Sequence, residues 1–204
     1  MKLLIVFIVP IFYFYMSWFF PWDIFQSKST ISITYVFDTF FILTIFFIFK
    51  NKKILGKFDR KGFAFRLSAV SIIGVICILL TKSLELKSPF KYIEYLFIQI
   101  LILAPIIEEL VFRGAFIQVF ENAKLKKPVI IYLNAILFSM SHLPALWYLP
   151  EEFHGFIGFQ LLYTLLLGWI CAKSRIKTKG MLEPVVLHFA FNLIFYIAVK
   201  NFGI

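Results

Sequence analysis

Long apolar stretches that carry few charged side chains recur along the whole chain and place the strongest limit on its fold. A helix needs about 20 mainly apolar residues to cross the roughly 30 Å of hydrocarbon in a bilayer. We predict a membrane-spanning helix in each of seven segments: residues 3–20, 31–49, 63–80, 92–117, 128–147, 156–172 and 181–199. The sequence therefore predicts an all-α, polytopic membrane protein, a bundle of about seven transmembrane helices.

The composition excludes several other classes of protein. Hydrophobic residues make up 61% of the chain and charged residues 16%, whereas a typical globular protein has roughly 45–50% and about 25%. A soluble domain with this composition would expose large apolar patches, so soluble, disordered and nucleic-acid-binding proteins are excluded. The two cysteines, Cys77 and Cys171, lie far apart inside apolar runs. We expect both to be buried and unpaired, with no disulfide or metal motif.

Basic residues cluster in alternate loops. Thirteen of them follow the second, fourth and sixth predicted spans: Lys50, Lys52, Lys53, Lys57, Arg60, Lys61, Lys124, Lys126, Lys127, Lys173, Arg175, Lys177 and Lys179. By the positive-inside rule these loops are cytoplasmic, so we expect the N-terminus in the cytoplasm and the C-terminus outside. The net charge of +10 then reflects topology and contact with anionic lipids, and a nucleic-acid partner is unnecessary.

The chain is expected to form one integral membrane domain over residues 1–204, because no internal repeat or long linker divides it. The first apolar segment has the length of a secretory signal, but no small-residue cleavage site follows it. We therefore predict that this segment is a retained helix.

The fourth predicted span carries the densest group of ionisable residues. Glu108, Glu109 and Arg113 lie in an otherwise apolar segment, and ionisable groups inside spans mark candidate functional sites. Glu109 and Arg113 have the i, i+4 spacing that favours an ion pair on a helix, whereas Glu108 points about 100° away. We interpret Glu109 as the supporting carboxylate and Glu108 as the reactive one; a purely structural ion-pair cluster is the alternative. Pro105 is expected to bend this helix.

Two later spans carry further polar residues. Phe138 and His142 lie one helical turn apart near the end of the fifth span, and His188 and Asn192 do so in the seventh. Each pair alone is typical of a helix–helix hydrogen bond or an interfacial residue. Membrane proteins gather such groups around one interior cavity, so we expect the three helices to share a site.

The combination of a carboxylate, two imidazoles and a carboxamide suits peptide-bond hydrolysis. A carboxylate and an imidazole can hold a water and remove its proton, while a second imidazole and an amide can donate hydrogen bonds to the developing oxyanion. Other mechanisms of proteolysis lack the residues that they need. No HExxH zinc helix is present, and neither Ser139 nor Ser141 is flanked by glycine, as a serine nucleophile would require. An aspartyl protease would need two aspartates in the membrane, and Asp38 is the only candidate. We expect Asp38 to hydrogen-bond to a neighbouring helix instead.

Taken together, the three motifs resemble those of the CPBP family, the CAAX-protease and bacteriocin-processing (Abi) group of intramembrane proteases, whose best-known member cleaves prenylated CAAX proteins. The EExxxR, FxxxH and HxxxN motifs of that family are matched by Glu108, Glu109, Arg113, Phe138, His142, His188 and Asn192. The resemblance covers about residues 92–199, which would form the catalytic core. It leaves the first three predicted helices without a role.

The resemblance implies a role for each motif residue. Glu108 and His142 would activate water, His188 and Asn192 would form the oxyanion hole, and Glu109, Arg113 and Phe138 would support them. The chain would then be an intramembrane endopeptidase acting on a membrane-associated peptide or protein. No cofactor is expected. A zinc ion held by Glu108, His142 and His188 is the alternative, since catalytic zinc commonly has three protein ligands and a water.

Other functions compete with proteolysis. Degenerate relatives are thought to act as membrane scaffolds or regulators, in bacteriocin self-immunity or surface-protein control, so a non-catalytic role is the main alternative. A transporter has less support because no inverted repeat is visible. The many Phe, Ile and Lys residues resemble those of a bacterial member, which predicts a bacterial plasma-membrane location. The substrate stays open among bacteriocins, peptide pheromones and surface proteins.

Overall fold

A computed structural model of the chain describes residues 2–19, 34–49, 55–92 and 97–202. Its long helices are α1 (Lys2–Phe19), α2 (Thr34–Phe49), α3 (Arg60–Ser83), α6 (Lys127–Met140), α8 (His154–Thr178) and α9 (Leu182–Phe202). A composite helix joins η3 (Phe97–Leu103), α4 (Ala104–Glu109), η4 (Leu110–Phe116) and α5 (Ile117–Asn122). Short helical turns form η2 (Pro89–Tyr92), α7 (Ala145–Tyr148) and η5 (Glu151–Phe153). The described residues contain no strand, so the prediction of an all-α fold is confirmed.

Four described segments are long and apolar enough to cross a membrane: Arg60–Ser83, Lys127–Tyr148, Glu151–Thr178 and Leu182–Phe202. The described parts of α1 and α2 are apolar but shorter. The chain is thus an all-α integral membrane protein. Each predicted span coincides with a helix, although residues 20, 31–33 and 93–96 of the predicted spans lie outside the described residues.

Helix ends differ from the predicted spans by several residues. The sixth span was predicted over residues 156–172, but α8 continues to Thr178 and includes Arg175 and Lys177. The Lys177 side chain is 58% exposed, as expected for a long basic residue in the last turns of a helix that emerges from the hydrocarbon. Arg175 is instead buried and pairs inside the bundle. Hydropathy therefore locates the apolar part of α8 but not its end.

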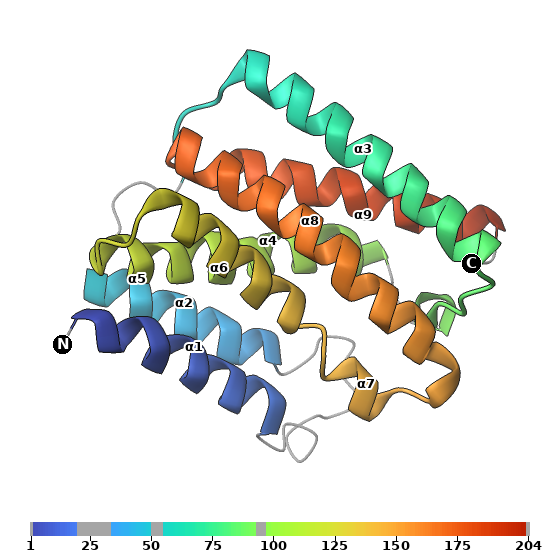
Figure 1. The fold of residues 1–204 in the computed structure, drawn as a ribbon, viewed down its shortest axis with the longest axis horizontal. Coiled ribbons are helices and arrows are strands. Elements are labelled where there is room, and N and C mark those ends of the chain that lie inside the picture. The colour runs from blue at the N-terminus through green and yellow to red at the C-terminus, as the bar shows by residue number, and fades with distance from the viewer. Residues whose placement is uncertain (1, 20–33, 50–54, 93–96, 203–204) are drawn as a thin grey trace.

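The basic loops share one end of the bundle, as the alternation predicted. In Figure 1 the start of α1, the start of α3, the turn between α5 and α6, and the turn between α8 and α9 all lie toward the left. The C-terminal end of α9 and the short helix α7 lie toward the right. Lys50, Lys52 and Lys53 lie outside the described residues.

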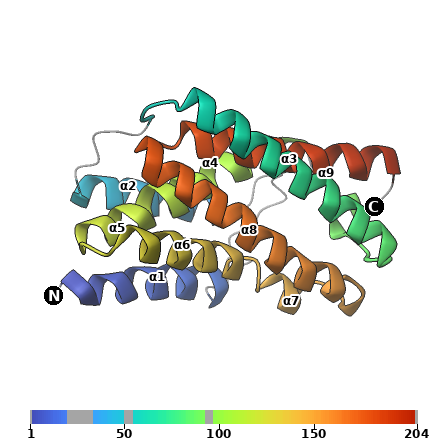
Figure 2. The same cartoon turned by 45° about the horizontal axis from the view of Figure 1, so that its top comes forward.

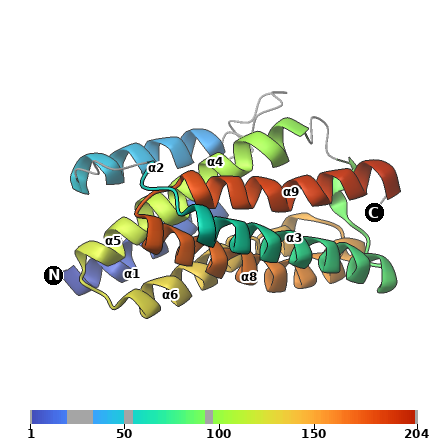
Figure 3. The ribbon, with the colours of Figure 1, turned by 90° about the horizontal axis from the view of Figure 1, so that it is seen from above.

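The helices are arranged around the composite helix of residues 97–122. α6 packs along α8, and α9 packs against both α3 and α8; Figures 2 and 3 show α3 and α9 side by side from two further directions. α1 and α2 contact the composite helix, where the ring of Phe116 lies against Tyr13 and Phe41. Tyr13 donates a 2.9 Å hydrogen bond to Asp38, which confirms the predicted contact between neighbouring helices.

A glycine sets the distance between α6 and α8. A Cβ atom added to Gly168 would lie 3.0 Å from Cδ1 of Phe138 and 3.2 Å from Cα of Ala135. Because such contacts are too tight for a well-packed core, the glycine lets the two backbones approach closely. Cys77 and Cys171 are buried and free, as predicted.

The composite helix is irregular on both sides of α4, since η3 and η4 are π-helical. Pro105 is the second residue of α4, just after η3 ends, and its missing N–H interrupts the regular hydrogen bonding there. Two carbonyls of η4 are paired by side chains from other helices: Asn134 donates to Phe112 O at 2.7 Å, and Arg175 donates to Arg113 O at 3.1 Å. Such π turns are frequent at functional sites.

Candidate active site

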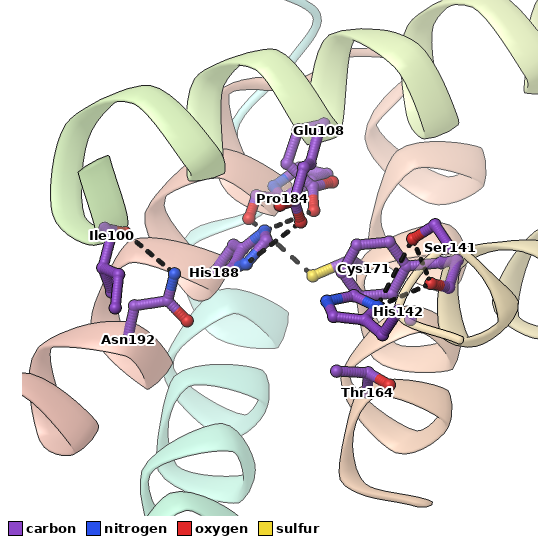
Figure 4. Close-up of polar contacts among 12 residues, drawn as sticks. Ile100, Glu108, Ser141, His142, Thr164, Cys171, Pro184, His188 and Asn192 are labelled. Atoms are coloured by element: carbon purple, nitrogen blue, oxygen red, sulfur yellow. Dashed lines mark hydrogen bonds and ion pairs between the residues drawn. The ribbon is translucent and has the colours of Figure 1, made fainter. Parts of the chain in front are cut away.

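A small cavity of about 210 Å³ between the helices collects the polar residues of the three motifs. Its lining includes Glu108 from α4, His142 from the turn after α6, and His188 and Asn192 from α9. Figure 4 shows Glu108, His142 and His188 around a common space, with Asn192 on one side. The structure therefore brings together residues from three segments that are far apart in the sequence.

Glu109 is the buried centre of this group. Its Oε1 atom lies 3.0 Å from Nη1 of Arg113 and 3.0 Å from Nδ1 of His188. The first contact is the ion pair that the i, i+4 spacing predicted. The second contact was not predicted, and it makes Glu109 a link between the composite helix and α9.

Arg113 is wholly buried beside Glu109. Its Nη2 atom donates a 3.1 Å hydrogen bond to the carbonyl of Gly168 on α8. Its guanidinium carbon lies 4.3 Å from the centroid of the Phe138 ring, a cation–π arrangement. Arg113 thus connects the composite helix to both α6 and α8.

Glu108 differs from its neighbour in exposure. Its side chain is 29% exposed, and its Oε2 atom lies 3.9 Å from Nε2 of His188. The two adjacent carboxylates therefore approach opposite nitrogens of the same imidazole. Glu109 is buried and paired, whereas Glu108 lines the cavity, which is the division expected from their 100° separation on a helix.

The His142 ring is oriented by the helix that precedes it. Its Nδ1 atom lies 3.1 Å from the carbonyl oxygen of Phe138 and 3.3 Å from the hydroxyl of Ser141. A carbonyl oxygen can only accept, so Nδ1 carries the proton in that contact. In the neutral ring Nε2 then has a free lone pair and can accept a proton.

Asn192 is fixed by the π-helical turn η3. Its Nδ2 atom donates a 2.9 Å hydrogen bond to the carbonyl of Ile100. A carboxamide nitrogen has two donors, so this contact orients the group and leaves a second N–H for another acceptor. The same residue lines the cavity.

Phe138 lies between the two imidazoles. Its ring meets His142 and His188 edge to face, with centroid separations of 5.3 Å and 5.6 Å. Phe138 is fully buried, so its ring limits how either imidazole can rotate. This geometry gives a physical reason for an aromatic residue at this position.

The structure also places residues in the cavity that the motifs did not indicate. Gln160, Tyr163 and Thr164 of α8 and Phe90 of η2 line it. The only signal for the α8 residues was the presence of polar side chains in an apolar span. A residue whose partners come from other helices has no local pattern that would identify it.

A second polar cluster was missed for the same reason. Arg66 of α3 lies 2.6 Å from Glu183 of α9, and Ser174 donates a 2.8 Å hydrogen bond to Glu183. Nearby, Lys177 lies 2.6 Å from Asp59 at the start of α3 and lowers the pKa of that carboxyl below its usual value. Arg66 and Glu183 both lie inside predicted spans, which was a usable signal. The cluster ties α3, α8 and α9 together at the end of the bundle that carries the basic loops.

The zinc alternative requires Glu108, His142 and His188 to converge on one ion. Among the residues that the structure describes, no three His, Cys, Asp or Glu side chains are placed to share a metal. Nδ1 of His188 is occupied by Glu109, so only its Nε2 atom could face an ion. The residues as arranged do not fit a three-ligand site, so no step proposed below runs through a metal.

Fold and cavity together define an all-α membrane protein that encloses a Glu, His and Asn site between its helices. Residues 91–194 match the family described as Type II CAAX prenyl endopeptidase Rce1-like. The chain belongs to this family, which is a family of proteases, and the matched region contains every motif residue from Glu108 to Asn192. The family resemblance of the three motifs is thereby confirmed.

A curated relative was also found. The chain is 26% identical over 163 residues to a protein of Escherichia coli named "Uncharacterized 24.3 kDa protein", and the alignment covers 72% of this chain and 71% of that protein. No solved structure matches the chain.

Proposed function

We propose that the protein is an intramembrane endopeptidase that hydrolyses a peptide bond of a membrane-associated peptide or protein. The single observation that carries this proposal is the cavity itself, which Glu108, His142, His188 and Asn192 line together. Membership in a protease family supports it. The bilayer and the substrate are the partners that the proposal requires.

Glu108 and His142 are proposed to activate the attacking water. The Glu108 carboxylate faces the cavity, and the arrangement at Nδ1 of His142 leaves Nε2 as a proton acceptor. A water between them loses a proton as its oxygen attacks the carbonyl carbon, and the proton later passes to the leaving amine as the C–N bond breaks. General-base catalysis of this kind contributes about 10²- to 10⁴-fold to a rate.

His188 and Asn192 are proposed to stabilise the oxyanion. Because Nδ1 of His188 donates to Glu109, Nε2 carries a proton only in the imidazolium form. The donor role therefore requires a positively charged ring, whose charge faces Glu109 on one side and Glu108 on the other. Asn192 would contribute the N–H that its contact with Ile100 leaves free.

We also propose a bacterial plasma-membrane location with the N-terminus in the cytoplasm. The grouping of the described basic loops at one end of the bundle supports this orientation. Cysteines introduced singly into the turn between α5 and α6 and into the segment between α7 and α8 would test it. A membrane-impermeant thiol reagent added to intact cells should label only the second position, and the opposite result would reverse the orientation.

Substrate trapping tests the peptidase function. Membranes from cells that express the wild type or Glu108→Ala would be compared for peptides that accumulate. Glu121→Ala is the matched control, because it removes a glutamate whose side chain is 41% exposed. We expect intact substrate to accumulate only with Glu108→Ala and shortened products only with wild type and control. Identical peptide sets in all three membranes would favour the non-catalytic scaffold.

A further inference from the structure

A second, larger cavity of about 730 Å³ adjoins the one that holds the motif residues. Its walls are mainly apolar and include Phe90, Ala145, Leu149, Phe153 and Ile157. The charged residue Glu152 also lines it and lies 2.8 Å from Lys87. Three residues line both cavities: Phe90, His142 and Gln160.

The volumes of the two cavities suggest different uses. Ligand sites in proteins usually measure about 300–1,000 Å³, so the 210 Å³ cavity is too small to hold much more than the bond being cleaved. The larger cavity lies within that range. A polypeptide that presents a peptide bond to Glu108 must continue beyond the small cavity, and the shared residue His142 marks where it can do so.

Gln160 stands at this junction with an unused side chain. The residue is only 9% exposed and lies on α8. Its backbone carbonyl accepts a 2.7 Å hydrogen bond from Thr164, but no described residue is hydrogen-bonded to its carboxamide. The carboxamide atoms are not among the fully enclosed unpaired atoms of the described residues. Because Gln160 lines both cavities, its unpaired amide is accessible to a ligand that enters them. A carboxamide offers both a donor and an acceptor, which matches the N–H and C=O of an extended peptide.

We propose that Gln160 binds the substrate main chain next to the scissile bond, while the larger cavity receives bulky apolar side chains on one side of that bond. This inference rests on the proposed peptidase function and adds a substrate class to it. The occupant is an extended peptide segment, because the larger cavity shares Phe90, His142 and Gln160 with the cavity that holds the reactive groups, so one chain can pass through both. Gln160 is a positioning residue, since it holds the substrate and takes no part in proton transfer.

Gln160→Met tests the first half of the proposal, because methionine has a similar shape and cannot make these hydrogen bonds. The matched control is Gln118→Met, a half-buried glutamine on α5 outside both cavities. Purified full-length protein would be assayed with a positional library of quenched fluorescent decapeptides. We expect Gln160→Met to raise KM about tenfold, the scale of one hydrogen bond, with kcat within a factor of about three. Gln160→Asn should recover part of the loss.

Ala145→Trp tests the second half by filling the larger cavity, with Ala64→Trp on the exposed face of α3 as its control. Wild type should prefer Phe, Leu or Trp over Ala at one library position, and Ala145→Trp should lose that preference. A Gln160→Met KM within twofold of the control, or an unchanged side-chain preference in Ala145→Trp, would overturn the inference.

A binding measurement separates this inference from the proposed function. The same peptides, labelled for fluorescence anisotropy, would be titrated with Glu108→Gln protein with and without Gln160→Met. We expect Gln160→Met to weaken binding about tenfold in this background. If wild type cleaves no peptide but this difference persists, the peptidase proposal fails while Gln160 stands as a peptide-binding residue. Equal binding by both proteins would overturn the role of Gln160 whatever the cleavage result.

Discussion

Replacing Glu109 by alanine would remove the anion that holds two cationic or donating groups in place. Nη1 of Arg113 and Nδ1 of His188 each lie 3.0 Å from the same carboxylate oxygen. Among the described residues, Arg113 would then keep only the Gly168 carbonyl and the face of Phe138 as partners. Since Arg113 is fully buried, water cannot readily replace the lost carboxylate.

The cost follows from this burial. Removing one partner of a buried ion pair typically destabilises a protein by about 3–5 kcal/mol. The cation–π contact of Arg113 with Phe138 is present in both the wild type and Glu109→Ala, so it does not offset the lost ion-pair energy. We therefore expect Glu109→Ala to lower the free energy of unfolding by about 3–5 kcal/mol. The control Glu121→Ala removes an exposed carboxylate 3.8 Å from Arg175 and should cost at most about 1 kcal/mol.

The free energy of unfolding would be measured by denaturant titration in mild detergent micelles, followed by far-ultraviolet circular dichroism. The double variant Glu109→Ala/Arg113→Ala should be less destabilised than the sum of its single variants, because it leaves no unpaired buried charge. A Glu109→Ala protein within about 1 kcal/mol of wild type would refute the reasoning. If that protein were also inactive, Glu109 would belong with the catalytic residues.

Three further predictions address the oxyanion hole, the helix packing and the metal alternative. Asn192→Ala should lower the single-turnover rate constant by about two to three orders of magnitude with peptide affinity unchanged; a rate within fivefold of wild type would remove Asn192 from the oxyanion hole. Gly168→Ala should reduce stability by about 1–3 kcal/mol in the same titration, because its Cβ would meet Phe138, and an unchanged midpoint would contradict the packing argument. The purified enzyme should keep its activity in a strong chelator and contain no stoichiometric metal by elemental analysis. Activity that is lost on chelation and restored by zinc would make Glu108, His142 and His188 ligands.

Local spacing predicted the parts of the site that depend on one helix. The i, i+4 relation placed Glu109 beside Arg113 and turned Glu108 toward a different direction, and both features are present. The same relation aligned Phe138 with His142, whose rings are in contact. The first of these contacts follows from the geometry of a single helix and the second from the turn directly after α6, so local spacing can indicate both without knowledge of the packing.

Contacts between helices could not be predicted in this way. The hydrogen bond between Glu109 and His188 joins residues 79 positions apart, and it depends on how α9 is rotated against the composite helix. The π-helical turns were not predicted either, because the spacing rules assume 3.6 residues per turn. The sequence did not indicate Gln160 for a related reason. Its proposed role depends on the two cavities that it lines, and these form only when the helices pack.

The most direct test of the central claim is the cleavage rate of Glu108→Gln. Glutamine keeps the shape of the side chain but cannot take a proton, so the protein should insert and unfold like wild type while its cleavage rate falls about 10²- to 10⁴-fold. The rate would be measured on a peptide recovered by substrate trapping, with Glu121→Gln as the control for an exposed carboxylate. We predict full activity in the control and almost none in Glu108→Gln. Cleavage by Glu108→Gln at the wild-type rate would contradict water activation by this carboxylate.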